Sequence, residues 1–424
     1  MAVADFNPLD PETVECPYPF YEAMRQEAPV HFVPALGFFI VSRYQTIHDV
    51  LRDPKLFSSR GGTRAFAADD PELAAITKQG YPQPDTLLTQ DPPVHGRYRR
   101  LVNRAFSARR VAALEPGIRS LATDLIDGFI ADGEIDFLDR FAVPLPVTVI
   151  ADQLGVSRDD LADFKRWSDD SVAPLGGMIT RERRLECARS LVEFQTYFAQ
   201  RIEERRADPQ DDLLSALVNA HLDVDGQVDA RIDGEDDGLD SRPLDVPEML
   251  SILNQILVAG NETTTNLLAS ALLLLLQNPD QMQVVRADPS AVDGLIEEAL
   301  RLESPVQGLF RVATADTELD GVPIPAGSRL VVMYASGNRD DAQFPDAANF
   351  DVCRADAATH LAFGGGEHFC LGAALARLEA RVAFEELLRR TAEIRLVDEQ
   401  GEFPHTPSFI LRGLTQLPVR IVPA

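Results

Sequence analysis

Hydrophobic residues recur along this chain with two different periods. Residues 19–27 and 44–52 have the spacing of short amphipathic helices, whereas residues 30–41 contain two short runs rich in valine and phenylalanine that predict a pair of strands. Helical spacing dominates from residue 114 to residue 219. The pattern therefore predicts a mainly α fold with small β-sheets, in which about residues 28–58 form a β-rich N-terminal part.

The longest apolar element is predicted from residue 245 to residue 277. Asp245 is a suitable N-cap, a proline follows in the first turn, and Glu248 stands at the third helical position. Roughly thirty residues at about 1.5 Å each give a helix of about 45 Å, long enough to cross a whole domain. Because residues 267–276 are apolar on almost every side, we expect this helix to be buried at the centre of the fold.

A polar patch of poor helix formers interrupts this helix at Ala259-Gly260-Asn261-Glu262-Thr263-Thr264-Thr265. The hydroxyl of Thr263 can hydrogen-bond back to the carbonyl of Ala259, which together with Gly260 would bend or open the helix. One interpretation is a tolerated kink. The other is a groove for a small ligand, with an acid at Glu262 and a hydroxyl at Thr263 beside it.

Four glycines and a cysteine lie close together in Phe363-Gly364-Gly365-Gly366-Glu367-His368-Phe369-Cys370-Leu371-Gly372. A helical pattern from residue 373 to about residue 390 follows, so Cys370 lies at a helix N-terminus. Free backbone N–H groups and the helix dipole there favour a thiolate, which would lower the cysteine pKa and make it a metal ligand or a nucleophile. The glycines allow the main chain to pass closely against a flat, bulky group. An inert buried cysteine is the alternative.

Three other types of site fit this loop less well. A phosphate-binding loop would need glycine in place of Phe369. Covalent haem attachment would need Cys-x-x-Cys-His, which is absent from the sequence. The candidate ligands of a zinc site would be Cys353, His360, His368 and Cys370, but their spacings match no usual zinc finger or ribbon.

Arginines are concentrated between residues 91 and 110, where six arginines accompany one aspartate. His95 and Arg99 are four residues apart and therefore project from one helix face, which suits a clamp for the carboxylates of a cofactor. A solvated helical face is the alternative. The preceding residues 58–90 are rich in Gly, Pro, Asp and Ala, and this composition favours a lid.

Composition limits the class of protein. The formal net charge of −27 argues against nucleic acid or an anionic membrane as a general partner. Four scattered cysteines form no disulfide framework and suit a reducing compartment. The N-terminus lacks the pattern of a signal peptide, and the longest apolar run, residues 267–276, is too short to span a bilayer. We expect a cytoplasmic protein without a membrane anchor, folded as one domain over residues 1–424.

The C-terminal half contains further predicted strands. Residues 311–313 and 329–333 have strand composition, with turn residues at 321–327 between them. Residues 409–414 alternate in hydrophobicity, and we expect them to close as a hairpin near residues 419–421.

Several of these motifs resemble those of the cytochromes P-450. The pattern Phe363-x-x-Gly366-x-His368-x-Cys370-x-Gly372 is similar to the haem-binding signature of this family, in which the cysteine thiolate is the axial iron ligand. The segment Asp91-Pro92-Pro93-x-His95-x-x-x-Arg99 is similar to the one whose His and Arg hold the haem propionates. Arg311 and His368 match the third and fourth propionate-binding positions.

Two further motifs strengthen the resemblance. Residues 259–263 resemble the oxygen-activation motif of the family, which assigns proton relay to Glu262 and Thr263. Glu298-x-x-Arg301 is similar to a structural pair that is buried and reaches the meander before the haem loop. With these motifs in the family's order, the resemblance implies the cytochrome P-450 fold, a single α-rich domain whose long central helix crosses haem b (heme, iron protoporphyrin IX).

The resemblance also implies a function. Such an enzyme is a monooxygenase that inserts one atom of dioxygen into a lipophilic small molecule, by hydroxylation or epoxidation, with electrons from a ferredoxin-type donor and its reductase. The remaining arginines near residues 91–110, together with Arg377, would form a docking patch for an acidic partner. The alternatives are a peroxide-driven haem oxygenase and a haem-based gas-binding protein without partner-dependent turnover.

The substrate pocket is expected to be apolar, although its residues do not identify the substrate. Candidate contacts come from the lid, the long helix, the segment after the Glu-x-x-Arg helix and the tail. They are Leu87, Leu88, Val258, Ala259, Val306, Leu309, Phe409 and Ile410.

Overall fold

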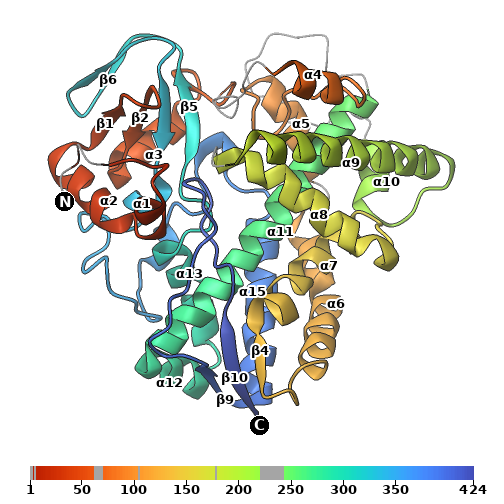
Figure 1. Cartoon of the computed structure of the whole chain (residues 1–424), viewed down its shortest axis with the longest axis vertical. Helices are drawn as coiled ribbons and strands as arrows, with labels where there is room; N and C mark the ends of the chain where they lie inside the picture. The colour runs from red at the N-terminus through yellow and green to blue at the C-terminus, as the bar shows by residue number, and fades with distance from the viewer. Residues whose placement is uncertain (1–2, 4–5, 62–69, 104–105, 177–178, 220–242) are drawn as a thin grey trace.

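A computed structural model of the chain describes residue 3 and residues 6–61, 70–103, 106–176, 179–219 and 243–424. Figure 1 shows most helices on one side of the molecule and the largest sheet on the other, with the helix α11 (Val246–Gln277) running through the middle. The predicted mainly α fold with small sheets is confirmed.

The helices that the sequence predicted begin and end close to their predicted positions. Their bounds are α1 Pro11–Glu15, α2 Tyr18–Glu27, α3 Tyr44–Arg52, α4 Pro71–Thr77, α5 Val94–Asn103, α6 Ala108–Asp127, α7 Pro144–Gln153, α8 Leu161–Val172, α9 Arg181–Ala207, α10 Leu213–Val218, α12 Pro279–Ala287, α13 Ala291–Leu302, α14 Tyr334–Gly337 and α15 Ala373–Arg390.

The largest sheet joins the N-terminal part of the chain to strands from the C-terminal half. Its strand order is β1-β2-β8-β5-β3, and β2 pairs in parallel with β8 while the other neighbours are antiparallel. The strands are β1 Val30–Val33, β2 Phe38–Val41, β3 Phe57–Ser58, β5 Leu309–Ala313 and β8 Arg329–Val332. The β-rich N-terminal part is therefore completed by strands from the C-terminal half, and the turn between β5 and β8 carries the small hairpin of β6 (Thr317–Leu319) and β7 (Val322–Ile324).

The prediction that residues 409–414 close as a hairpin near residues 419–421 is wrong. Strand β10 (Pro418–Pro423) pairs instead with β9 (Thr391–Leu396) and with β4 (Glu134–Asp136), so that Val419 lies opposite Leu396 on one side. Residues 409–414 form only isolated bridges. All six are buried, so their alternation does not correspond to one exposed and one buried strand face.

Helix α11 has the predicted start and the predicted central position. The Asp245 side chain accepts from the backbone N–H of Glu248, and the Glu248 carboxylate accepts from the N–H of Asp245, which completes a capping box. The helix packs against α7, α8, α13 and α15, and Leu267, Leu268 and Leu272 lie in the largest hydrophobic core cluster. Within the described residues, no helix combines the length and the hydrophobicity that crossing a bilayer requires.

The pair Glu298 and Arg301 on α13 is fully buried, as predicted. Two hydrogen bonds of 2.7 Å join the guanidinium to the carboxylate, and both side chains have 0% exposure. Arg301 also donates to three backbone carbonyls of the irregular segment that precedes the cysteine loop, those of Asn338, Ala347 and Asn349. The pair therefore fixes this segment to α13.

Candidate functional site

The cysteine loop is closed on itself and packed against α3. Gly364 and Gly366 have positive φ angles of 67° and 63°, which favour glycine. At Gly366 a Cβ atom would lie 2.2 Å from the carbonyl oxygen of Leu51, so no larger residue fits. The N–H of Cys370 donates to the carbonyl of Phe363 over 3.0 Å. This bond fixes the backbone of Cys370, which lies two residues before Gly372, the N-cap of α15.

Burial dominates the electrostatics of Cys370. It raises the pKa of the thiol, while the backbone N–H groups of Gly372 and Ala373 and the charges of Arg99 and Arg377 act in the opposite direction. The prediction that the helix start would lower this pKa is therefore wrong in its net direction, because desolvation exceeds the helix contribution. A metal ion that binds here has to displace the thiol proton.

Four nitrogen-bearing side chains meet next to this loop. His95 and Arg99 come from α5, Arg311 from β5 and His368 from the loop itself. The rings of His95 and His368 have centroids 4.3 Å apart, and Nη2 of Arg99 donates to the carbonyl of Phe369 over 2.6 Å. The structure thus brings together the propionate-binding residues that the resemblance assigned.

This cluster disfavours additional positive charge. Burial, followed by the charge of Arg99, lowers the pKa of His95 to about 4. Burial, followed by the charge of Arg311 and by His95, lowers the pKa of His368 to about 3. The Nδ1 atom of His95 is buried without a hydrogen-bond partner. Anionic carboxylates placed among these groups would gain strong, charge-assisted hydrogen bonds, so the cluster fits the two propionates of haem b.

Sequence reasoning missed two polar neighbours of this cluster. The hydroxyl of Ser59 lies 3.0 Å from Nε2 of His368, and the side chain of Tyr334 hydrogen-bonds with Arg311. His368 also bonds with the backbone of Leu87 in the lid. Neither Ser59 nor Tyr334 belongs to a recognisable motif, so only their positions in space reveal them.

A single protein ligand to iron is consistent with this chemistry. Across the residues that the structure describes, no three His, Cys, Asp or Glu side chains gather to hold a metal ion. An iron bound by Cys370 would therefore need its other ligands from a cofactor, which is what a porphyrin provides. Leu371, the residue after Cys370, packs on the same hydrophobic cluster as Ile256 and Leu257 of α11, so the loop and the middle of α11 share one core.

The polar patch of α11 has the predicted internal hydrogen bond. The hydroxyl of Thr263 donates to the carbonyl of Ala259 over 2.7 Å, and the helix continues through the patch. Val258, Glu262 and Thr263 are partly exposed and Ala259 is exposed, although most of the helix is buried. These side chains give the centre of the molecule an accessible acid and hydroxyl.

Glu262 has surroundings that favour its protonated form. Burial raises the pKa of its carboxyl, and the charge of Asp169 acts in the same direction, while the charge of Lys165 and the nearby side chain of Asn266 oppose the shift. Lys165 and Asp169 form an ion pair on α8. A carboxyl that holds its proton more tightly than usual is suited to pass a proton on.

The lid is attached to α11. The Ser251 hydroxyl donates to the carbonyl of Pro84 over 2.9 Å, and the N–H of Leu88 donates to the side-chain oxygen of Gln255 over 2.7 Å. The amide of Gln255 also donates to the hydroxyl of Thr86. Residues 62–69 of the predicted lid lie outside the described residues.

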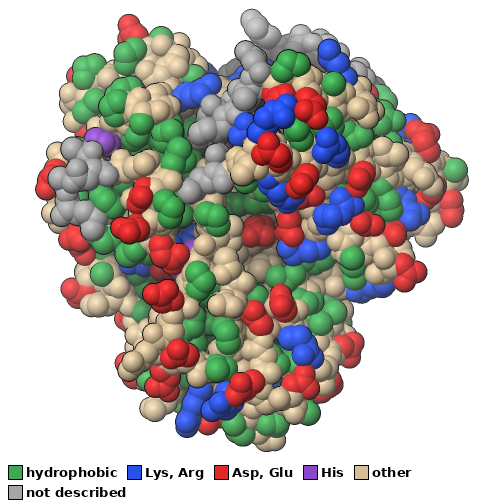
Figure 2. Space-filling model, viewed as in Figure 1, with side chains coloured by type: hydrophobic (Ala, Val, Ile, Leu, Met, Phe, Trp, Pro, Cys, Tyr) green, Lys and Arg blue, Asp and Glu red, His purple; other side chains and the backbone are tan. Residues whose placement is uncertain are grey.

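The expected substrate contacts divide into two groups. Leu87 packs on the core cluster of α11, and Val258, Val306 and Leu309 are partly exposed. Figure 2 shows a hollow in the surface between the lobe that carries α1 and α2 and the lobe that carries α8 and α9. Leu88, by contrast, is 39% exposed.

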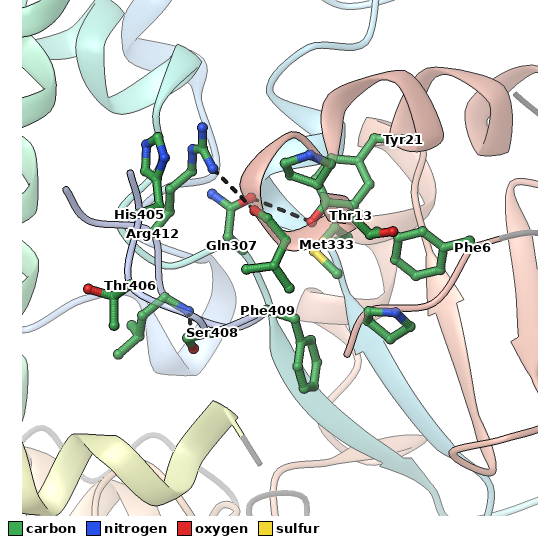
Figure 3. A pocket seen from close by; sticks show the side chains of 14 residues that line it. Phe6, Thr13, Tyr21, Gln307, Met333, His405, Thr406, Ser408, Phe409 and Arg412 are labelled. Atoms are coloured by element: carbon green, nitrogen blue, oxygen red, sulfur yellow. Dashed lines mark hydrogen bonds between the residues drawn. The ribbon is translucent and has the colours of Figure 1, made fainter. Parts of the chain in front are cut away.

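Phe409 and Ile410 have a different environment from the one expected. Both are buried in a core cluster with the N-terminal segment, and Phe409 packs against the rings of Phe38 and Phe310. Figure 3 shows Phe409 at a pocket between the N-terminal segment and the C-terminal loop. The free volume of this pocket is about 10 Å³. That volume accepts about one water molecule, so packing alone accounts for these two residues.

Comparison with known proteins agrees with this geometry. A sequence model described as Cytochrome P450 matches residues 162–411. The chain is 37% identical over 424 residues to the cytochrome P450 monooxygenase PikC of Streptomyces venezuelae, covering 99% of this chain and 94% of that protein. It is 38% identical over 404 residues to a steroid C26-monooxygenase of Mycobacterium tuberculosis, covering 95% and 93%.

A solved structure gives the same result. Cytochrome P450 CYP109Q5 from Chondromyces apiculatus superposes with a TM-score of 0.85 at 40% sequence identity, over 100% of this chain and 99% of that chain. The similarity therefore covers the fold, the cysteine loop and the central helix together. The chain belongs to the cytochrome P450 family, and it is a monooxygenase with haem b as its cofactor.

Proposed function

We propose that Cys370 is the iron ligand of this monooxygenase and that His95, Arg99, Arg311 and His368 hold the haem propionates. The observation that carries this assignment is the cluster of imidazole and guanidinium groups around the cysteine loop, in which His95 and Arg311 are buried and Nδ1 of His95 lacks a partner. Protein cores bury such groups only when they are paired, and two carboxylates would pair them.

When bound, haem supplies dioxygen activation, with the thiolate of Cys370 increasing the electron density at the iron. The chain itself supplies protons. The Thr263 hydroxyl uses its single proton in the bond to Ala259, so its lone pairs remain available to accept from water. Glu262, whose pKa burial raises, holds the proton that water passes toward Thr263.

We further propose a lipophilic substrate that lies against Leu87, Val258, Ala259, Val306 and Leu309. These side chains are apolar, and those on α11 and β5 are at least partly exposed. Leu88 is placed at the outer side of the lid. A steroid is a reasonable first test compound, because one relative is named a steroid C26-monooxygenase.

The electron donor is proposed to be an acidic ferredoxin that docks beside Phe369, which is 45% exposed. Arg100, Arg109 and Arg110 are exposed at the end of α5 and the start of α6, and positive charge there would steer an acidic partner. Arg97 does not contribute to this surface, because it is buried in an ion pair with Glu248. Arg104 lies outside the described residues.

The test combines a ligand panel with turnover. Fatty acids, terpenoids, steroids and macrolides are scored by the spin-state shift of the ferric haem, and the compounds that shift it are incubated with ferredoxin, reductase and reductant. We expect lipophilic ligands to produce the shift and to yield an oxygenated product in proportion to reductant consumed. A shift produced only by charged compounds contradicts the apolar pocket. Product formed from peroxide alone, with none from ferredoxin, supports a peroxide-driven oxygenase instead.

A further inference from the structure

Three charged or polar side chains from separate segments meet behind the cysteine loop. Glu297 comes from α13, Arg377 from α15 and His360 from the segment just before the loop. Nε and Nη2 of Arg377 donate to the two carboxylate oxygens of Glu297 over 2.6 and 2.8 Å. Nε2 of His360 lies 3.3 Å from Oε2 of Glu297. The geometry of the arginine pair is bidentate, which is the strongest form of this interaction.

The backbone fixes the orientation of His360. Its Nδ1 accepts a hydrogen bond from the N–H of Ala362 over 3.1 Å, so in the neutral ring the proton is on Nε2, which faces Glu297. The side chain of His360 is 1% exposed and that of Glu297 is 16% exposed. Burial by itself raises the pKa of Glu297, but the hydrogen bonds from Arg377 and the nearby imidazole of His360 outweigh it and hold this pKa at about 2. The carboxylate therefore remains charged and attracts both neighbours.

These groups enclose Phe363, the first residue of the haem signature. The guanidinium carbon of Arg377 lies 4.5 Å from the centre of the Phe363 ring, and the ring of His360 lies 5.6 Å from it. The carbonyl of Phe363 in turn accepts the N–H of Cys370. Because three glycines follow Phe363, the loop backbone has little stiffness of its own, and the contacts to Phe363 contribute, with the packing on Leu51 and the bond from Arg99, to the position of Cys370.

The partners of Arg377 fix its orientation beside the loop. Because two of its donors are bound to Glu297 and its plane lies over Phe363, Arg377 is held in one orientation. This differs from the expected role of Arg377 as part of a docking patch, since docking would compete with an existing bidentate pair.

We infer that Glu297, His360 and Arg377 are positioning residues that hold the Cys370 loop in its ligating geometry. This inference rests on the proposed assignment of Cys370 as the iron ligand. It concerns the position of the loop that carries the sulfur, and it leaves proton delivery at Glu262 and Thr263 unchanged.

The test compares variants of the haem-loaded enzyme by the spectrum of the reduced carbon monoxide complex. For Glu297→Gln and Arg377→Met we expect the thiolate-type band to be lost on the order of tenfold faster than in the unchanged enzyme, with a shift in the iron reduction potential. Arg377→Lys retains the charge but not the bidentate pair, so its potential should lie between those of Arg377→Met and the unchanged protein.

Arg381→Met is the matched control. Arg381 lies one turn further along α15 and forms ion pairs with Glu115 and Glu385, so its loss removes comparable pairing without touching Phe363. If Glu297→Gln and Arg377→Lys changed the thermal midpoint as Arg381→Met does but left band lifetime and potential unaltered, the positioning role would be wrong. Absence of the thiolate-type band in the unchanged enzyme would instead contradict Cys370 as the ligand, so the two failures are distinguishable.

Discussion

At the scale of single residues, the site depends on groups whose neighbours alter their ordinary chemistry. Glu262 holds its proton more tightly than a surface glutamate, because desolvation and the charge of Asp169 raise its pKa. Thr263 has its hydroxyl proton committed to the carbonyl of Ala259, so its oxygen can only accept a hydrogen bond. The acid can therefore pass its proton to a water molecule that the Thr263 hydroxyl orients.

Replacing Thr263 with alanine should uncouple the reaction while leaving haem bound, because Thr263 is not among the proposed haem contacts. We expect product per reductant consumed to fall by about an order of magnitude, with hydrogen peroxide released in its place. Thr263→Ser, which keeps the hydroxyl, is the control and should retain most of the coupling. The measurement is product and peroxide per reductant; an unchanged product yield in the alanine variant would exclude the relay.

A second residue-scale prediction concerns Glu379 on α15. It is 2% exposed, its Oε2 atom has no hydrogen-bond partner, and burial raises the pKa of its carboxyl to about 8. Between the ordinary pKa of a glutamate and the raised pKa of Glu379, the folded protein therefore keeps this proton, whereas the unfolded chain releases it. This stabilisation is fully present at low pH and is lost as the pH rises through about 8, at about 1 kcal/mol per pH unit between the two pKa values.

Glu379→Gln removes this titration with little change of shape. We expect the variant to gain stability over the unchanged protein between pH 5.5 and pH 8, by roughly 2 to 3 kcal/mol. The free energy of unfolding in urea, measured for both proteins at the two pH values, gives the difference directly. A difference that did not vary with pH would mean that Glu379 is not protonated in the fold.

At the scale of elements, α11 connects the proposed lid to the proposed haem site. Ser251 and Gln255 lie one turn apart on this helix and bond to Pro84, Thr86 and Leu88. The next two turns carry Val258, Ala259 and Glu262. One helix therefore holds residues 84–88 and also carries the groups proposed to lie beside the substrate.

Gln255→Leu should loosen the lid, since it removes hydrogen bonds to the N–H of Leu88 and to Thr86. At about 1 kcal/mol per bond, or about 2 kcal/mol for the two bonds, we expect hydrogen exchange at residues 84–90 and the rate of substrate release to rise about thirtyfold. Asn254→Leu is the matched control, because the side chain of Asn254, next to Gln255 in the sequence, hydrogen-bonds to Ser171 on α8 and not to the lid. Equal exchange in both variants would assign no latch function to Gln255.

At the scale of the whole molecule, the two ends of the chain are tied together through a buried carboxylate. Glu303, at the end of α13, accepts from Tyr18 and from Arg412, each over 2.7 Å, and from Arg339 over 3.0 Å. Arg412 also donates to the carbonyls of Val14 and Glu15, and it lies at the pocket in Figure 3. The N-terminal helices and the C-terminal loop thus depend on one ion-paired centre.

Glu303→Gln should weaken this connection strongly, because it leaves two arginines largely buried without their counter-charge. Breaking a buried pair in this way costs about 3 to 5 kcal/mol, and limited proteolysis should then cut within the first 30 residues. Tyr18→Phe removes only one hydrogen bond and should cost about 1 kcal/mol. If both substitutions had the same effect on the free energy of unfolding, the charge would not be what holds the ends together.

Features that depend on residues close together in the sequence followed from the sequence itself. The capping box of α11 and the hydrogen bond from Thr263 to Ala259 each join residues at most four positions apart, and both were predicted correctly. The burial of the Glu298–Arg301 pair on α13 was implied by the family resemblance and not by the spacing alone. Helix limits were accurate for the same reason, since caps and periodicity are local. The order of the motifs sufficed for the family resemblance.

The tertiary structure decided what distant segments do to one another. Strand β10 pairs with β9 and β4, Phe409 packs beside Phe38, and Arg377 is bound by Glu297. Burial also reversed the expected pKa shift of Cys370. The spacing of residues along the chain determines local hydrogen bonds. Desolvation and long-range ion pairs depend on which segments come into contact when the chain folds, and residue spacing does not determine those contacts.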